Sequence, residues 1–415
     1  MYIVGLIILA VTIFFVVKRY EIRMVLFASG LLMCIIALEP NTAFDAFATR
    51  MTTGGLITAI LSVLAFAHVM RLTQCDQHLI HLLVNGLKKV RPILIPGAVL
   101  ATFAINIALP SAAGTSAAVG AVFIPVLMAA GIHPALAGAA VLSGTFGSML
   151  NPGLSHNPFI AELAEVEVLS VIATHSTATI VSIVIAAIAL TVVGIIRKEL
   201  SGHEFELEKD EDFKVSILKA LVVVIPLALL VLGATEIIPQ LAELSIPGAM
   251  LIGAILGMAV TRTNPVEVTK TFFDGMGTAY SSVMGIIIAA AVFVAGLQAL
   301  GVIDALINAM LNFEAIAGYA GTFGPFLLAV ISGSGDAAAF AFNEAITPFA
   351  ADFGFGTVEL GSIAALAGAL GRTMSPVAAA TIVCAGYAMV NPMELAKRTA
   401  PGMIIATIVA MIILL

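Results

Sequence analysis

Residues 109–116 read Leu-Pro-Ser-Ala-Ala-Gly-Thr-Ser and lie within a stretch, 92–161, that contains no Asp, Glu, Lys or Arg. The apolar run 92–131 around them is too long for one membrane span, which needs about 20 residues. Pro, Gly and other small residues break its centre, and irregular backbone is tolerated at membrane depth only where it is buried in protein or lines a water-filled cavity. We therefore predict a re-entrant hairpin that enters the membrane, turns near 109–116 and leaves on the same side.

A second apolar stretch, 317–352, is broken in the same way at Ser332-Gly333-Ser334-Gly335-Asp336, and we interpret it as a second re-entrant hairpin. The whole chain is 61% hydrophobic and only 10% charged, whereas soluble domains carry about 25% charged residues. A soluble protein must wet its surface, so this deficit indicates a lipid-facing exterior. The composition predicts an all-α polytopic membrane protein.

The remaining apolar segments provide about ten crossings. Two segments of mixed polarity, 75–91 and 301–315, are predicted to lie along the membrane surface. The predicted spans are 2–17, 24–39, 54–71, 135–165, 168–196, 217–235, 245–261, 277–299, 357–389 and 400–415.

The basic residues support this layout. With Lys18 in the cytoplasm, all of the 18 basic residues except Arg50 and Arg372 fall inside or at the inner boundary, as the positive-inside rule requires. If either hairpin were counted as a single crossing, the orientation of every later segment would be reversed. The basic residues would then no longer gather on the cytoplasmic side. The layout predicts a multi-pass protein of a bacterial or archaeal-type cytoplasmic (inner) membrane, with both termini outside.

The two halves of the sequence align with each other. A shift of about 223 residues brings Ser111 onto Ser334, and a shift of about 224 brings Pro152 onto Pro376. Chance is the alternative, but both halves also show the same order of elements. Each half would cross the membrane five times, because a hairpin does not cross. An odd number of crossings places the second half in the opposite orientation to the first, and inverted repeats with discontinuous helices are typical of secondary transporters. The predicted first repeat is 1–196, with a scaffold at 1–91, a hairpin and broken helix at 92–166 and a closing helix at 168–196. A cytoplasmic linker, 197–216, follows it. The predicted second repeat is 217–415, with a scaffold at 217–315, a hairpin and broken helix at 317–389 and a closing helix at 400–415.

Polar residues gather at the breaks, which are the hairpin tips 110–116 and 332–336 and the interrupted spans around 148–158 and 372–376. Helix arms that begin after a tip present free N–H groups and a positive dipole end, which suit a carboxylate. The alternative is that small residues here only permit close helix packing; breaks in repeat-related positions favour a binding site. The predicted substrate-binding residues are Ser111, Gly114, Thr115, Ser116, Asn151, Ser332, Ser334, Gly335, Arg372, Thr373 and Ser375.

Arg372 is the most informative single residue. A central intramembrane arginine costs at least about 2.5 kcal/mol on insertion scales, so it needs a partner. Its guanidinium could clamp a substrate carboxylate through two hydrogen bonds. The alternative is a structural ion pair with Asp336 or Glu344.

Asp336, Asn343 and Glu344 are the predicted residues for cation or proton coupling. The helical spacing places Asn343 almost below Asp336, with Glu344 beside it. Together they could bind Na⁺ or exchange protons, because buried carboxylates carry protons near neutrality. The alternative is that Glu344 reaches the boundary and is simply hydrated. No cofactor and no metal other than Na⁺ is predicted.

Other polar residues are interpreted as structural. His68, His156 and His175 are isolated in apolar segments, although His156 is close to a predicted break. Cys34, Cys75 and Cys384 lack metal-ligand spacing and are interpreted as reduced packing residues. The sequence has no Ser–His–Asp arrangement and no nucleotide loop, so we expect neither an enzyme nor an ATP-driven pump. No nucleic-acid partner is predicted.

The segments 111–132, 332–344 and Gly371-Arg-Thr-Met-Ser-Pro-Val377 resemble the DcuC family of anaerobic C4-dicarboxylate carriers, as does Pro392-Met-Glu-Leu-Ala-Lys-Arg-Thr399. The resemblance implies succinate, fumarate, malate or aspartate as substrates, moved by symport, antiport or exchange. It also implies a homodimer in which hairpins and broken helices slide as an elevator past a scaffold, with Arg372, Thr373 and Ser375 as substrate contacts. The sequence departs from the family at Asp336, where Asn is common, and at 151–157.

Three other functions are weighed against a dicarboxylate carrier. The first is a carrier for another small organic anion, and the second is a sodium/proton exchanger of the same superfamily that uses Asp336. The third is a membrane subunit of a larger assembly that needs a binding protein.

Overall fold

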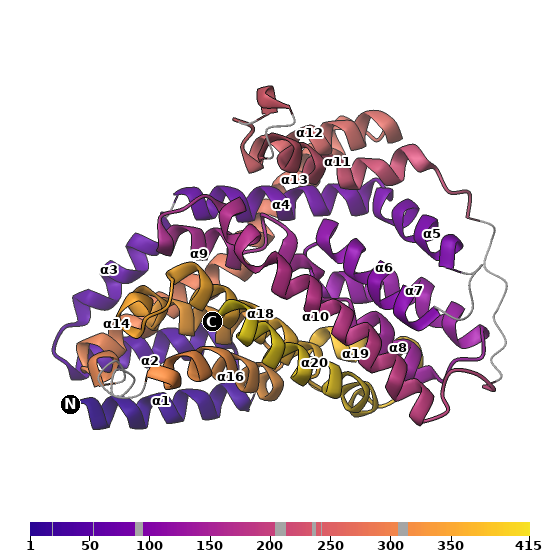
Figure 1. The fold of residues 1–415 in the computed structure, drawn as a ribbon. Coiled ribbons are helices and arrows are strands. Elements are labelled where there is room, and N and C mark those ends of the chain that lie inside the picture. Colours follow the sequence, from indigo (N-terminus) through magenta and orange to yellow (C-terminus); the bar gives the residue numbers. More distant parts are fainter. Residues whose placement is uncertain are drawn as a thin grey trace.

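The computed structural model describes residues 1–18, 20–52, 54–87, 94–203, 213–234, 238–241, 243–305 and 314–415. Over these residues the secondary structure is helical, with no β-strand, which confirms the all-α prediction. Figure 1 shows the helices packed side by side in an elongated bundle. The predicted surface segment 301–315 and linker 197–216 lie partly outside the described residues, as does the end of 75–91.

The helices of the first half follow the predicted order, with one addition, α3, that was not predicted. The loop between α6 and α7 coincides with the predicted first break. These helices are α1 (Tyr2–Val17), α2 (Ile22–Ile36), α3 (Pro40–Met51), α4 (Gly54–Leu72), α5 (Cys75–Leu87), α6 (Leu94–Ala108), α7 (Ala112–Ala129), α8 (Pro134–Ser143), a 3-10 turn (Gly147–Leu150), α9 (His156–Ala164) and α10 (Val168–Ile196).

The second half also contains an unpredicted helix, α13, which continues through a π-helical turn into α14. The predicted span 277–299 is therefore the end of a longer helix. The last helix begins at Pro392 rather than at residue 400. The helices are α11 (Ile217–Ala234), a 3-10 turn (Pro239–Leu241), α12 (Ile246–Thr261), α13 (Pro265–Ala279), the π turn (Tyr280–Met284), α14 (Gly285–Ala299), α16 (Glu314–Ser332), α17 (Gly335–Ala345), a 3-10 helix (Thr347–Phe353), α18 (Thr357–Thr373), α19 (Ala379–Ala388) and α20 (Pro392–Leu414).

Several helices have the length and composition of membrane spans. Among the described residues, four segments qualify alone, namely α7, α10, the continuous helix 265–299 and α20, and the bent pair α3–α4 adds a fifth. Others, such as α2, α12 and α16, are apolar but shorter. The number of crossings, and the interpretation of α6–α7 as a hairpin that does not cross, stay predictions.

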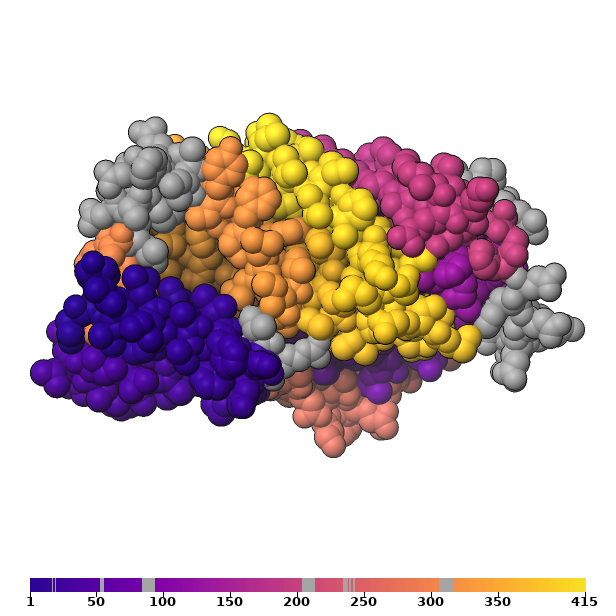
Figure 2. Space-filling view, turned by 90° about the horizontal axis from the view of Figure 1, so that it is seen from below, coloured from indigo at the N-terminus to yellow at the C-terminus, as the bar shows by residue number. Residues whose placement is uncertain are grey.

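Apolar side chains cover the outside of these helices. On α10, Ile180, Val184, Ile188 and Ile195 are exposed and fall on one face because they are four or seven residues apart, close to one or two helical turns. An exposed isoleucine stripe of this length suits lipid. Figure 2 shows the N-terminal helices, in indigo, at one end of the molecule and the C-terminal segment, in yellow, running across its middle.

Close backbone approaches hold neighbouring helices together. A Cβ at Gly30 of α2 would lie 2.3 Å from the carbonyl oxygen of Val292 in α14, and a Cβ at Gly296 would lie 2.5 Å from the carbonyl oxygen of Gly30. Small residues at such contacts are typical of helix pairs in membranes, where dispersion forces rather than water exclusion drive packing.

The helices form two groups by contact. In one, α2 and α3 pack on α14, α4 packs on α12 and α13, and α5 packs on α11. In the other, α6 packs on α8, α7 on α19, α16 on α18, and α10 on α20. The groups meet where α4 touches α9, where α5 touches α6 and α7, and where α14 touches α17, and less extensively where α11 touches α6 and α1 touches α16.

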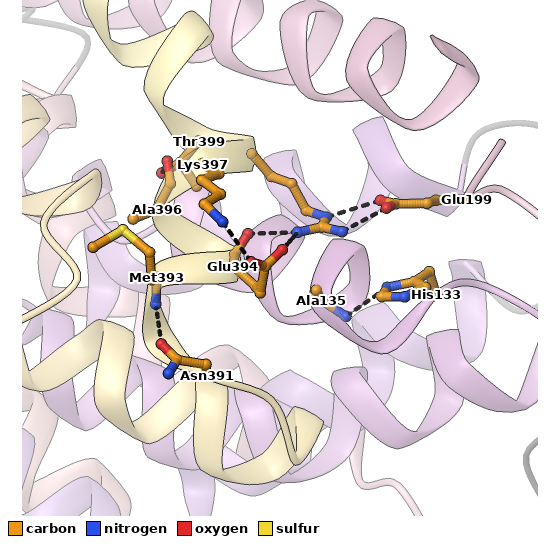
Figure 3. A network of polar contacts seen from close by, with 10 residues as sticks. His133, Ala135, Glu199, Asn391, Met393, Glu394, Ala396, Lys397 and Thr399 are labelled. Atoms are coloured by element: carbon orange, nitrogen blue, oxygen red, sulfur yellow. Dashed lines mark hydrogen bonds and ion pairs between the residues drawn. The ribbon is translucent and has the colours of Figure 1, made fainter. Parts of the chain in front are cut away.

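An ion-pair network ties the end of α10 to the start of α20. The Arg398 guanidinium, 3% exposed, pairs with Glu199 beyond the C-terminus of α10 and with Glu394, whose Oε2 lies 2.9 Å from Nη1 of Arg398. Lys397 also pairs with Glu394, at 2.7 Å. Figure 3 shows these side chains beside His133, which precedes α8. The network therefore joins three segments at the end of the bundle next to the linker 197–216.

Candidate functional site

All the predicted breaks open onto one cavity of about 410 Å³. The tip between α6 and α7, the tip between α16 and α17, and both interrupted spans contribute to its wall. One face of α4, the end of α13 and the π turn before α14 complete it. Its polar and charged lining residues are His68, Arg71, Ser111, Ser148, Ser155, His156, Thr278, Ser282, Asp336 and Arg372.

The first tip is built around Asn106. Its side-chain nitrogen donates to the carbonyl oxygen of Leu109 and to Oγ1 of Thr115, both at 3.0 Å, and its Oδ1 accepts from the backbone N–H of Ser148 at 2.8 Å. Asn106 thus fixes the tip to the interrupted span α8–α9. Ser111 caps α7 by accepting from the N–H of Gly114 at 3.1 Å, so the positive end of the α7 dipole faces the cavity.

The second tip repeats this design. Ser334 caps α17 by accepting from the N–H of Ala337 at 3.3 Å, and Ser332 donates to the carbonyl oxygen of Leu328 at 2.7 Å. Gly333 has a positive φ of 78°, which a residue with a side chain adopts only with strain. Of this tip, Gly333 and Asp336 reach the cavity.

Asp336 faces the cavity from the first turn of α17. Its side chain is 55% exposed, and its Oδ1 lies 3.1 Å from Nε2 of His156. The His156 ring is 3% exposed and stacks on Phe340, with 4.4 Å between ring centroids. Packing therefore fixes the imidazole and aims one nitrogen at the carboxylate.

Arg372 lies in the last turn of α18, on the opposite interrupted span. Its Nη2 donates to the carbonyl oxygen of Thr145 at 3.0 Å, whereas its buried Nη1 has no hydrogen-bond partner among the described residues. No ion pair joins Arg372 to Asp336 or Glu344 in the part of the chain that the structure describes. Glu344 instead pairs with Arg50. A backbone contact thus holds Arg372 in place, and its second terminal nitrogen, Nη1, remains available as a donor beside the cavity.

The other predicted substrate residues hold the breaks together rather than line the cavity. Thr115 and Ser116 are buried in α7, and Gly335 packs against Gly368. Asn151 donates to the carbonyl oxygen of Ile107 at 2.7 Å and accepts from Gly153. Thr373 and Ser375 are bound to neighbouring backbone, at Ala369 and Val377 respectively. Gly114 directly follows Ala113, the last lining residue of the first tip.

The structure separates the three residues predicted for cation coupling. Asn343 donates to the carbonyl oxygen of Gly361 at 3.2 Å and accepts from Thr347. Glu344 pairs with Arg50, which also binds Glu162 at 3.0 Å. Only Asp336 faces the cavity. Among the described residues, no group of three or more His, Cys, Asp or Glu side chains is arranged to hold a metal ion.

Seven of the ten polar and charged lining residues were not predicted to belong to the site, and three of these seven, Arg71, His68 and His156, can carry a charge. Arg71 was interpreted as a boundary residue, and His68 and His156 as packing residues. The signal for His156 was its position in the predicted break, where side chains are directed at the cavity rather than at a helix neighbour. For Arg71 and His68 the sequence signal is their spacing of three residues, which places both on one face of a helix.

Comparison with known proteins adds to this geometry. The family model described as DcuC, a C4-dicarboxylate anaerobic carrier, matches residues 36–415. An uncharacterized transporter of Haemophilus influenzae is 45% identical over 272 residues, which cover 63% of this chain and 98% of that protein. A second one from the same organism is 55% identical over 136 residues, which cover 33% of this chain and 94% of that protein. The anaerobic C4-dicarboxylate transporter DcuC of Escherichia coli is 25% identical over 443 aligned residues, which cover 99% of this chain and 95% of that protein.

Proposed function

The chain belongs to the DcuC family, whose members are membrane transporters and not enzymes, and we propose that it is a secondary active transporter for small dicarboxylates of the succinate, fumarate, malate and aspartate type in the inner membrane. The observation that carries this proposal is the single cavity at which both hairpin tips and both interrupted spans meet. Two helix N-termini and Arg372 give that cavity the groups that bind carboxylates.

Arg372 is the proposed anchor for one substrate carboxylate. Its Nη1 is buried and has no hydrogen-bond partner among the described residues. Leaving a buried donor of a charged group without a partner costs on the order of several kcal/mol. A carboxylate in the cavity would satisfy it. Ser111 and Ser148 lie in the same wall and supply further hydrogen-bond donors.

An inverted repeat is the proposed architecture around the cavity. Contacts recur at the shift found in the sequence: a Cβ at Gly147 would lie 2.1 Å from the carbonyl oxygen of Phe103, and a Cβ at Gly371 would lie 2.3 Å from that of Phe326. Backbone conformations recur too, since Glu165 and Met389 both have positive φ, of 53° and 54°. These recurrences support the repeat.

Opposite directions of the two interrupted spans support its inversion. The span α8–α9 begins beside Glu199, because the N–H of His133 donates to the carbonyl oxygen of Glu199 at 2.9 Å. The span α18–α19 ends close to that place, because α20, which follows it, pairs Arg398 with Glu199. One span therefore starts where the other finishes.

Elevator transport is proposed from the two groups of helices, and a homodimer from the resemblance to the family. The group of α1–α5 with α11–α14 contains the segments assigned to the scaffold from the sequence, and the group of α6–α10 with α16–α20 contains both proposed hairpins. Among the described residues, the first group reaches the cavity through one face of α4, which carries His68 and Arg71, through Thr278 of α13 and through the π turn. Sliding of the second group would move Asp336 and Arg372 together.

Na⁺ or H⁺ is the proposed coupling ion, with Asp336 as its carrier. The carboxylate faces the cavity and contacts His156, so a cation or proton at Asp336 would lie beside the substrate. A bound cation would also offset the charge of a dianion at the shared site.

Uptake by the purified protein in liposomes tests the function. We expect labelled succinate or fumarate to be accumulated under a Na⁺ or pH gradient, or exchanged against internal dicarboxylate. Arg372→Ala should lower the rate by at least about a hundredfold, since it removes a charged pair with the substrate, and Lys397→Gln, on an exposed residue outside the cavity, should not. Normal uptake by the Arg372→Ala protein would reject the anchor. Proton release driven by Na⁺ with no organic solute would favour an exchanger instead.

A further inference from the structure

Arg71 is the second guanidinium at the cavity. It lies in the last turn of α4, and the lining residues of that helix, Ile60, Leu64, His68 and Arg71, fall on one face. In the described part of the chain its guanidinium forms no hydrogen bond and no ion pair. Asp76 is close enough to interact with its charge, but the Asp76 carboxylate accepts instead from the N–H of Gln77 at 2.8 Å. Arg71 is therefore a cation at the cavity wall that the protein itself does not neutralise by contact.

The first hairpin tip makes room for this guanidinium. A Cβ at Gly114 would lie 2.2 Å from Nη2 of Arg71 and 3.0 Å from Oγ of Ser111. The guanidinium therefore occupies the space beside the N-terminal turn of α7, next to the cap residue Ser111. An anion there would meet the arginine fork and the helix N-terminus together.

We propose that Arg71 binds the second carboxylate of the substrate while Arg372 binds the first. The proposal rests on the function proposed above and adds the group that distinguishes a diacid from a monoacid. Arg71 and Arg372 come from separate elements, α4 and α18, and line the same cavity. Asp336 is the only carboxylate among its described lining residues. A dianion spanning the two arginines would give each of its carboxylates a guanidinium partner.

The competing explanation is that Arg71 is only a boundary cation that follows the positive-inside rule. Such a residue contributes to orientation and to the general potential of the cavity. It would affect monoanions and dianions alike, and it would not depend on whether position 114 carries a side chain. These differences decide the test.

Equilibrium binding to the purified full chain in detergent makes the distinction, with succinate as the diacid and butyrate as a monoacid of the same carbon number. Arg71→Gln should weaken succinate binding about 10- to 100-fold and change butyrate binding by less than about twofold. Arg71→Lys, which keeps the charge and loses the fork, should fall between. Lys270→Gln on α13, an exposed residue outside the cavity, removes the same charge and should leave both affinities unchanged.

Gly114→Ala supplies a second measurement. The added methyl group meets the far end of the flexible Arg71 side chain and lies 3.0 Å from Oγ of Ser111, so we expect the fold to persist while the guanidinium moves away and the Ser111 side chain shifts slightly. Succinate binding should weaken, and the double variant with Arg71→Gln should bind no more weakly than Arg71→Gln alone, because both changes remove one interaction. Additive effects, an equal loss for succinate and butyrate, or unchanged binding by Arg71→Gln would each overturn the proposal. If the unaltered protein binds no dicarboxylate, the proposed function itself is wrong.

Discussion

The imidazole of His156 and the carboxylate of Asp336 join two broken elements across the cavity, with 3.1 Å between Nε2 and Oδ1. His156 begins α9 and Asp336 stands in the first turn of α17, so the contact links the first interrupted span to the second hairpin. One partner is 3% exposed and the other 55%. A fixed buried ring thus holds a carboxylate that remains open to the cavity.

Asp336→Asn tests whether this carboxylate couples transport to a cation. The amide keeps a hydrogen-bond acceptor for His156 but cannot carry a proton or bind a cation by charge. We expect the variant to lose uphill accumulation of succinate while keeping exchange of external for internal succinate. Both are measured in liposomes, with and without an ion gradient. Uphill accumulation at the normal level by Asp336→Asn would assign the coupling elsewhere.

Arg50 is expected to stabilise the end of the bundle opposite the linker. Its side chain is 14% exposed and pairs with Glu162 of α9 and with Glu344 of α17, which is 12% exposed. Removing one partner of a buried pair costs about 3–5 kcal/mol because it leaves a charge uncompensated. Arg50→Gln should therefore lower the thermal midpoint in detergent more than Glu344→Gln, which leaves Arg50 its contact with Glu162.

The double variant is the control for this ion pair. Arg50→Gln with Glu344→Gln removes both charges, so part of the lost stability should return. If the two single effects simply add, the residues do not act as a pair and the assignment fails.

The breaks could be predicted from the sequence because the residues that make them are local signals. Ser111 and Ser334 cap the helices that follow the tips, and Gly333 permits the turn. By contrast, α3 and α13 escaped prediction because segments of mixed polarity fail the test for an apolar span. Their starts did carry a signal, since Pro40 and Pro265 occupy the first helical turn, where Pro is favoured.

The lining of the site was harder to predict, for a physical reason. A helix that is apolar on every side gives no indication of which face is directed at a cavity. Thr115 and Asn343 therefore looked equivalent to Ser111 and Asp336, although their side chains bind neighbouring backbone or side chains. Arg71 looked like any basic residue at a membrane boundary. Its role depends on which helix ends beside the first tip, and that contact is fixed only by packing.

Two glycines of the interrupted spans should resist substitution. A Cβ at Gly147 or Gly371 would meet the carbonyl oxygen of Phe103 or Phe326, at 2.1 Å and 2.3 Å respectively. Backbone cannot move aside as a side-chain tip can, so Gly147→Ala and Gly371→Ala should each destabilise the protein by about 1–3 kcal/mol or more. Thermal unfolding in detergent measures this. Gly386→Ala in α19, where a Cβ meets nothing within 4 Å, should be neutral or stabilising by up to about 1 kcal/mol.

His133 should make stability depend on pH at the start of α8. Its Nδ1 accepts from the N–H of Ala135 at 3.1 Å and so caps the helix, which only the form unprotonated at Nδ1 can do. The pKa of His133 lies below its usual 6.5, chiefly because of burial. The positive charge of Arg398 and the neighbouring His203 also lower this pKa, whereas Glu199 and Glu394 raise it. Figure 3 shows His133 and Glu199 at this place.

The direction of the effect follows from the lowered pKa. Folding favours the neutral ring, so its contribution is fully present above the unfolded pKa of 6.5 and is lost as the pH falls through the lower folded value. His133→Asn keeps a capping acceptor without titrating in this range. The thermal midpoint of the unaltered protein should therefore fall, relative to that of His133→Asn, between about pH 7.5 and about pH 5.5. Parallel curves for the two proteins over this interval would show that the cap does not depend on the protonation of His133.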